Sequence, residues 1–234
     1  MIAIALFLAV IGAIAAWWLS QQRLTAKPWL EEGPLGEFPG SGVSSVPTAK
    51  IGLGVFLAVV GSLFALLISA YLVRTELGEW RPPPAPKLLW VNTGVLAASS
   101  IALHLARTAA RRGELDDVRS GLLVGGLSAI VFLAGQLLVW KRLEAEGYYL
   151  ASNPASSFFY LMTAAHGLHV GGGLVALAKT GAKAWRGAPP DRLRLGVELC
   201  AIYWHFLLFV WLILFAVLMG WSEDLVVICR AWLT

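Results

Sequence analysis

The chain has 234 residues, of which 58% are hydrophobic and only 14% are charged. A soluble domain carries roughly 25% charged and 45–50% apolar residues, so this composition excludes an ordinary soluble protein and predicts an integral membrane protein with several spans. The formal net charge of +4 does not indicate nucleic-acid binding, because excess Lys and Arg in a membrane protein are ordinary and report loop orientation. Two cysteines are too few for a disulfide framework.

The first 50 residues predict one membrane helix followed by a linker. Residues 1–20 are apolar over their whole length and end in Trp17 and Trp18. They lack the basic start and the small-residue cleavage site of a secretory signal, which favours a retained span. Residues 21–50 are rich in Pro, Gly and Ser, a composition that does not support a helix across the segment.

Five further apolar stretches have the length of a membrane span, because a helix needs about 20 apolar residues to cross the hydrocarbon of a bilayer. They are residues 51–73, 88–106, 121–140, 158–178 and 195–221. The fold class is therefore all-α and integral to the membrane, with six transmembrane helices. The predicted organisation is a helix at 1–20, a linker at 21–50, a five-helix bundle at 51–221 and a tail at 222–234.

The segments between these spans carry most of the charge and the turn signals. Residues 107–119, 141–157 and 179–194 are expected to be loops, and Asn153-Pro154 predicts a turn that leads into a helix start. The loops after spans one, three and five hold twelve Lys and Arg residues, whereas the other loops and the tail hold six. The richer side should be cytoplasmic, which places both termini outside.

The last span contains the most informative polar residues. Glu198, Tyr203, Trp204 and His205 interrupt its apolar first half. Polar side chains inside a membrane span cost free energy unless protein neighbours satisfy them. Glu198 and His205 follow helical spacing, so both should lie on one face that is turned toward other helices.

The other spans hold further polar candidates. In the fifth span His166 and His169 are three residues apart and therefore share a helix face. His104 lies three residues from Arg107 and is expected at the membrane edge. Hydroxyl and amide side chains in a span usually bond to a neighbouring helix or to their own helix. The remaining candidates of this kind are Asn92, Thr93, Ser99, Ser100 and Gln136.

Three functional interpretations fit these residues. A haem protein would need two histidines on opposite sides of the iron; His166 and His169 share a face, but either could pair with His205. A transporter would need ionisable groups along a path, and only Glu198 qualifies. The third interpretation is structural, with Glu198–His205 and His166–His169 as interhelical hydrogen bonds. The residues by themselves favour this non-catalytic helical module.

Four segments resemble subunit III of the haem-copper oxidases. GVELCAIYWHFLLFVWLILF resembles the last-helix signature of that family, a Glu followed by Tyr-Trp-His-Phe and Val-Trp. The three other segments are similar to the His-Gly-x-His-Val, Asn-Thr…Ser-Ser and Gln-containing helices of the family, and all four come in the family order. The matched positions include nine candidate site residues, which are Asn92, Gln136, His166, His169, Glu198, Tyr203, Trp204, His205 and Trp211.

The resemblance implies a fold and a role. The family bundle has seven helices, split into a two-helix and a five-helix part around a lipid-filled cleft, and spans two to six match the five-helix part. The chain would be a metal-free subunit that binds phospholipid and packs on the catalytic subunit I and other oxidase subunits in the bacterial cytoplasmic membrane. Haem and copper would lie in subunit I. The role would be to stabilise that subunit and support its proton uptake.

The nine matched positions would then be structural or lipid-binding residues, with none catalytic and none a metal ligand. The equivalent subunit of a quinol oxidase or of a nitric oxide reductase is the main alternative, and a haem b-binding electron carrier is another. The chain also departs from the family where acids are usual, because Val60, Val139 and Leu208 stand at those positions. Functions tied to the family's buried Glu are therefore not expected here.

Overall fold

The computed structural model describes residues 47–75, 80–84, 86–187 and 190–220, without the side chains of 190–192. The predicted span at 1–20, nearly all of the linker and the tail from 222 lie outside these residues. The described part is all-helical, and its five helices are each long and apolar enough to cross a membrane. They are α2 (Thr48–Thr75), α3 (Leu88–Arg112), α4 (Leu115–Ala145), α5 (Pro154–Trp185) and α6 (Pro190–Leu218).

The helices are longer than the predicted spans, and the predicted loops were largely wrong. Residues 107–112, 141–145 and 179–185 belong to the ends of α3, α4 and α5, and the last three residues of the predicted linker begin α2. Hydropathy marks only the part of a helix that fits in hydrocarbon. Charged residues such as Arg and Lys are good helix formers, so they extend a helix beyond the membrane instead of ending it.

Two turns show how the sequence ends and restarts these helices. Gly113 closes α3 with a φ of 80°, a left-handed conformation that favours glycine, and its backbone N–H donates to the carbonyl of Ala109. Asn153 starts α5: its side chain accepts a 3.0 Å hydrogen bond from the backbone N–H of Ser156, and Pro154 occupies the first turn. The predicted turn at Asn153-Pro154 is therefore confirmed.

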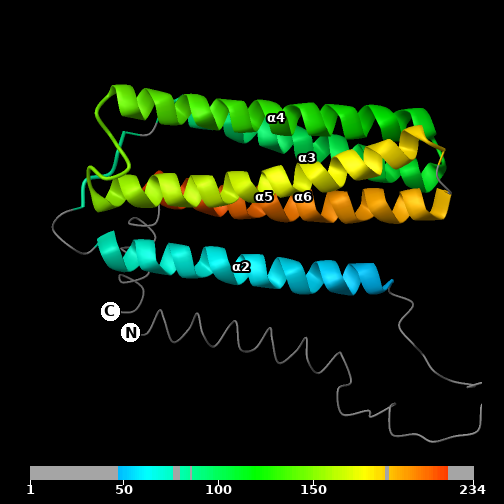
Figure 1. Cartoon of the computed structure of the whole chain (residues 1–234), viewed down its shortest axis with the longest axis horizontal. Helices are drawn as coiled ribbons and strands as arrows, with labels where there is room; N and C mark the ends of the chain where they lie inside the picture. The colour runs from blue at the N-terminus through cyan, green and yellow to red at the C-terminus, as the bar shows by residue number, and fades with distance from the viewer. Residues whose placement is uncertain (1–46, 76–79, 85, 188–189, 221–234) are drawn as a thin grey trace, which may run out of the picture. The chain divides into compact units, whose positions relative to one another are not determined.

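Four of the helices form a closed ring, and the fifth packs on its outside. In the order α3, α4, α5, α6 each helix contacts the next, and α6 returns to α3. Helix α2 contacts α5 and α6, and Figure 1 shows it beside them and away from α4. Half of the most apolar window of α6 is buried, against 11% for α2. Helix α6 is thus the central element and α2 the most peripheral one described.

Glycines allow α3 and α4 to approach closely. A Cβ atom added to Gly121 would lie 2.7 Å from the Cβ of Ala106, and one added to Gly125 would lie 2.8 Å from the Cγ of Leu103. Gly135 faces the Asn92 side chain, with no room for a Cβ. Small residues at such spacing let helix backbones pack tightly in lipid, where no hydrophobic effect drives them together.

Candidate functional site

The centre of the bundle is joined by a hydrogen-bonded chain across three helices. Trp204 on α6 donates its indole N–H to the hydroxyl of Ser99 on α3 at 2.9 Å. The same hydroxyl donates to the carbonyl of Gly125 on α4 at 2.7 Å. Both side chains are fully buried. Each polar side-chain atom in this series of hydrogen bonds therefore has a partner on a neighbouring helix, as an apolar membrane interior requires.

Three more contacts repeat this arrangement at other levels of the bundle. Trp211 donates its indole N–H to the hydroxyl of Thr93 at 3.0 Å, which joins α6 to α3. Tyr203 donates its hydroxyl to the carbonyl of His169 at 2.9 Å, which joins α6 to α5. The amide of Asn92 donates to the carbonyl of Phe132 on α4 at 3.4 Å. The indole and phenol groups thus bond to other helices as well as filling volume.

Glu198 is the centre of an ion cluster at the end of the bundle where α2 and α6 begin and α3 ends. One carboxylate oxygen lies 2.8 Å from Lys50 Nζ. The other lies 2.9 Å from Arg107 Nη2 and 3.4 Å from Arg111 Nη2. The side chain of Glu198 is 15% exposed, so these charges are only partly screened by water. One acid therefore connects three helices.

His205 does not pair with Glu198, which differs from the expected hydrogen bond. Its Nδ1 lies 2.5 Å from the hydroxyl of Ser100, and its Nε2 lies 3.4 Å from Nδ1 of His104. Two turns of α6 separate Glu198 from His205, and the carboxylate of Glu198 is instead bound by arginine side chains of α3. His104 is exposed and lies one turn from Arg107.

His166 and His169 do not bond to each other either. Both contact the ring of Phe64, so they do face the same side of α5. Nδ1 of His169 lies 2.7 Å from the carbonyl of Ala165 on its own helix. His166 is fully buried against Phe132 and Trp211, and neither ring nitrogen has a hydrogen-bond partner among the described residues. The four candidates therefore occupy three separate environments instead of one polar cluster.

Gln136 is also buried, and within the part of the chain that the structure describes its amide has no partner. Two of the positions where the family usually has acids lie in the apolar core: Val60 is 3% exposed and Val139 is fully buried. Neither contributes a charge to the interior. The interior polarity of the described bundle comes from hydroxyl, amide, indole and imidazole groups.

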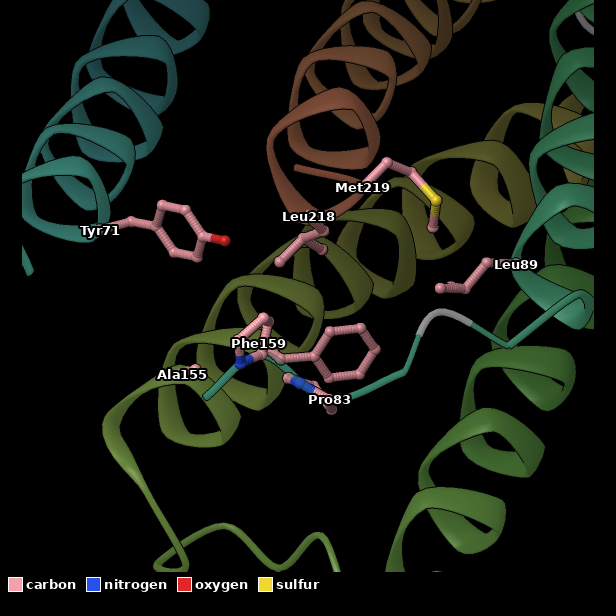
Figure 2. A pocket seen from close by; sticks show the side chains of 8 residues that line it. Tyr71, Pro83, Leu89, Ala155, Phe159, Leu218 and Met219 are labelled. Carbon is pink, nitrogen blue, oxygen red and sulfur yellow. The ribbon is translucent and has the colours of Figure 1, made fainter. Parts of the chain in front are cut away.

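Two hollows bear on ligand binding. A cavity of about 10 Å³ lies where Tyr71, Leu89, Phe159 and Leu218 converge, and Figure 2 shows their side chains around it. That space suffices for one water molecule and not for a substrate or a haem. A second hollow of about 330 Å³ is an open groove between α2, α5 and α6. Residues lining this groove include Leu53, Phe56, Leu168, Ala176, Cys200 and Tyr203.

Sequence reasoning missed the ion partners and undervalued the serines. Lys50 was assigned to the linker, and Arg107 and Arg111 to a loop, so none was considered as a partner of Glu198. Ser99 and Ser100 were predicted to bond to a neighbouring helix or to their own helix. Ser99 accepts the indole N–H of Trp204, and Ser100 is the hydrogen-bond partner of His205. The spacing from His104 to Arg107 to Arg111 marks one helix face, and it could have indicated a continuous α3.

The described residues contain no group of three or more His, Cys, Asp or Glu side chains that could hold a metal ion. The expectation that this chain carries no metal stays a prediction, as does the assignment of haem and copper to a partner.

Comparison with known proteins adds an independent finding. A family profile described as cytochrome c oxidase subunit III matches residues 44–223. The chain is 32% identical over 173 residues to cytochrome c oxidase subunit 3 of Synechocystis sp., covering 70% of this chain and 72% of that protein. It is 33% identical to cytochrome c oxidase subunit 3 of Thermostichus vulcanus, covering 72% of this chain and 85% of that protein. It is 34% identical to a probable cytochrome c oxidase subunit 3 of Mycobacterium bovis, covering 69% of this chain and 80% of that protein.

Proposed function

Because the chain belongs to the cytochrome c oxidase subunit III family, we propose that it is the non-catalytic, metal-free subunit III of a respiratory haem-copper terminal oxidase. That complex reduces oxygen to water, with cytochrome c as the electron donor that the names of the relatives indicate. In the complex the chain packs on the catalytic subunit, stabilises it and supports its proton uptake. Haem and copper lie in the catalytic subunit.

One observation carries the proposal: many polar side chains of the described bundle join one helix to another. Trp204, Ser99 and Gly125 join three helices, and Glu198 joins three helices through Lys50 and the α3 arginines. An active site would instead converge such groups on a cavity large enough for substrate. The geometry supports a rigid scaffold whose partners carry out the redox chemistry.

The groove between α2, α5 and α6 supports phospholipid binding. Its lining is almost entirely apolar, as an acyl chain requires. Lys50 lies one helical turn before Leu53, and Lys179 lies one turn after Ala176, at the end of the bundle that carries the ion cluster. A lipid phosphate would meet these cations while the tail occupied the groove. We place the chain in a bacterial cytoplasmic membrane with this basic end inside.

The proposal is tested by purifying the oxidase through an affinity tag on this chain. We expect a haem-copper catalytic subunit to co-purify in a one-to-one ratio, with oxygen consumption supported by reduced cytochrome c. The isolated chain should show no Soret absorption. A preparation that oxidises only quinol, or that reduces nitric oxide, would identify the equivalent subunit of those enzymes instead. Haem bound to the isolated chain would contradict the metal-free assignment.

Deleting the chain separates the two proposed roles. Without it, the remaining complex should still reduce oxygen, but it should lose activity faster during turnover because catalytic-site stability and proton supply both suffer. Proton uptake by the deletion complex, followed with a pH indicator, should be slower at high pH, where protons are scarce. Unchanged turnover lifetime and unchanged proton uptake would contradict both roles.

A further inference from the structure

The outward faces of three helices suit lipid tails. The exposed side chains of α2 include Val59 and Leu66, those of α4 include Leu127 and Val131, and Leu168 on α5 is 76% exposed. Apolar surfaces of this kind are stable against hydrocarbon and give no reason for a protein neighbour.

The boundary between α3 and α6 is different. We define the α3–α6 seam as Ser100, His104 and Arg107 on α3 with Glu198 and His205 on α6. These residues form two groups on the same pair of helices: Arg107 binds Glu198, and His205 lies within hydrogen-bond distance of both Ser100 and His104. Of the four histidines in the described residues, only His104 is exposed, and His205 is half-buried. Hydrogen-bonding groups therefore reach the outer surface here.

The seam has hydrogen bonds left to make. Nε2 of His104 has no partner within the described segments, and the side chain of Arg107 is 26% exposed. Among the described residues the charge is also uneven, because Lys50, Arg107 and Arg111 share the single carboxylate of Glu198. Both the unpartnered nitrogen of His104 and the excess positive charge call for an acceptor with negative charge.

Depth along the helices decides between lipid and protein as the source of that acceptor. His205 lies seven residues beyond Glu198, which places it about 10 Å further along α6 at 1.5 Å per residue. Lipid phosphates can reach the charged end of the bundle, whereas a polar group further along the span would meet only acyl chains. Imidazole groups exposed at that depth are costly unless a protein supplies a partner.

We propose that the α3–α6 seam is the face through which this chain docks on the catalytic oxidase subunit. The surface that covers it is a membrane helix with a carboxylate directed at Arg107 and a hydrogen-bond acceptor, about one turn away along α3, directed at His104. The inference rests on the proposed function, which supplies the partner, and adds which face of the bundle meets it and by what chemistry.

Site-specific photo-crosslinking in the intact membrane-embedded complex tests the docking face. Benzoylphenylalanine replaces Ile101 or Phe209, which flank the two histidines and are 60% and 61% exposed. The matched controls are Leu127 on α4 and Val175 on α5, which are 60% and 57% exposed. All four positions are apolar and outward-facing, so the probe should not disturb folding. We expect the seam probes to label the catalytic subunit at least about fivefold more than the controls, because the photo-activated probe reacts only with groups that it contacts.

The outcomes separate the inference from the function on which it rests. Labelling of the catalytic subunit from Leu127 or Val175, with none from Ile101 or Phe209, overturns the docking face and leaves the proposed function intact. If the seam probes label only lipid and a control position labels the catalytic subunit, the docking face is likewise overturned and the proposed function stands. Failure of all four probes to label any oxidase subunit contradicts the proposed function itself, and the inference falls with it.

A pair of substitutions tests the hydrogen bond without relying on the probe. His104→Leu removes the imidazole and keeps the bulk, whereas His104→Gln keeps a donor. We expect His104→Leu to lower the fraction of chain retained on the catalytic subunit in detergent by about fivefold, and His104→Gln to restore most of it. Thermal unfolding of the isolated chain should change little, because His104 is exposed there. Equal retention of both variants would overturn the role of His104.

Discussion

The indole nitrogen of Trp204 lies 2.9 Å from the hydroxyl of Ser99, in the fully buried centre of the bundle. That hydroxyl also donates to Gly125, so a single small side chain on α3 connects α6 and α4. Large aromatic residues of α6 fill the interior, and small polar residues of α3 supply the acceptors that make their burial possible. The stability of the chain should therefore depend on these small residues as much as on the aromatic ones.

Ser99→Ala should destabilise the bundle by about 1–2 kcal/mol, because it leaves the Trp204 N–H buried without an acceptor and removes the bond to Gly125. Unfolding of the isolated chain in mixed micelles measures the effect. Ser62→Ala is the control, since that exposed hydroxyl bonds, within the described segments, only to Ala58 of its own helix. Equal unfolding midpoints for the two variants would show that the hydrogen bonds of Ser99 to Trp204 and Gly125 contribute no net stability.

Gly173→Ala should cost about 1–3 kcal/mol, because overpacking forces neighbours to move. A Cβ at this position would lie 2.6 Å from the Tyr203 ring and 2.9 Å from the Trp204 ring. Gly171→Ala is the matched control on the same helix: nothing lies within 4 Å, and the higher helix propensity of Ala should leave stability equal or slightly raised. The same unfolding assay applies, and a reversed order of the two variants would contradict the packing of α5 on α6.

Glu198→Gln should weaken the hold of α2 and α3 on α6 by about 1–3 kcal/mol, since three cations lose their carboxylate. We expect reduced retention of the chain in the complex, more so at raised ionic strength, with oxygen reduction persisting in the complexes that remain intact. The ratio of this chain to the catalytic subunit after detergent washing is the measurement. Glu114→Gln, a neutralisation at the exposed turn between α3 and α4, should change nothing. Full retention with abolished turnover would indicate a direct catalytic role for Glu198.

His166→Phe should be neutral or stabilising by up to about 1 kcal/mol, because replacing an unpartnered buried polar group with an apolar ring of similar shape removes a desolvation cost. The imidazole sits 5.0 Å from the Trp211 ring centre and 5.8 Å from that of Phe132, in surroundings that suit an aromatic ring. Micelle unfolding again reports the change. A loss above about 1 kcal/mol would show that His166 has a polar partner after all.

Ala176→Trp should displace the phospholipid that we assign to the groove between α2, α5 and α6. A side chain of this size fills a large part of the 330 Å³ space, because Ala176 lines it directly. Native mass spectrometry of the complex should show one fewer retained phospholipid. Val175→Trp places the same bulk on the neighbouring exposed position, outside the groove lining, and should leave the lipid count unchanged. Equal lipid retention in both variants would remove the groove as a lipid site.

The comparison of spans and helices shows what local patterns can and cannot determine. Hydropathy located every described helix, because burial in hydrocarbon demands apolar side chains along about 20 residues. It misplaced their ends by up to seven residues, as at Lys179 to Trp185, because helix formation continues into water wherever the backbone bonds are satisfied. The turn at Asn153 was predictable, since a cap is a local hydrogen bond.

The sequence by itself therefore determined that this is a helical integral membrane protein, and the order of its motifs indicated the family that the comparisons then showed. The tertiary structure decided the partners: Glu198 with Lys50 and two arginines, His205 with Ser100 and His104, and His166 with aromatic rings. Helical spacing tells which residues share a face. The partner that a side chain meets on the opposite helix depends on the register and rotation of that helix. Both are set by the packing of many residues at once.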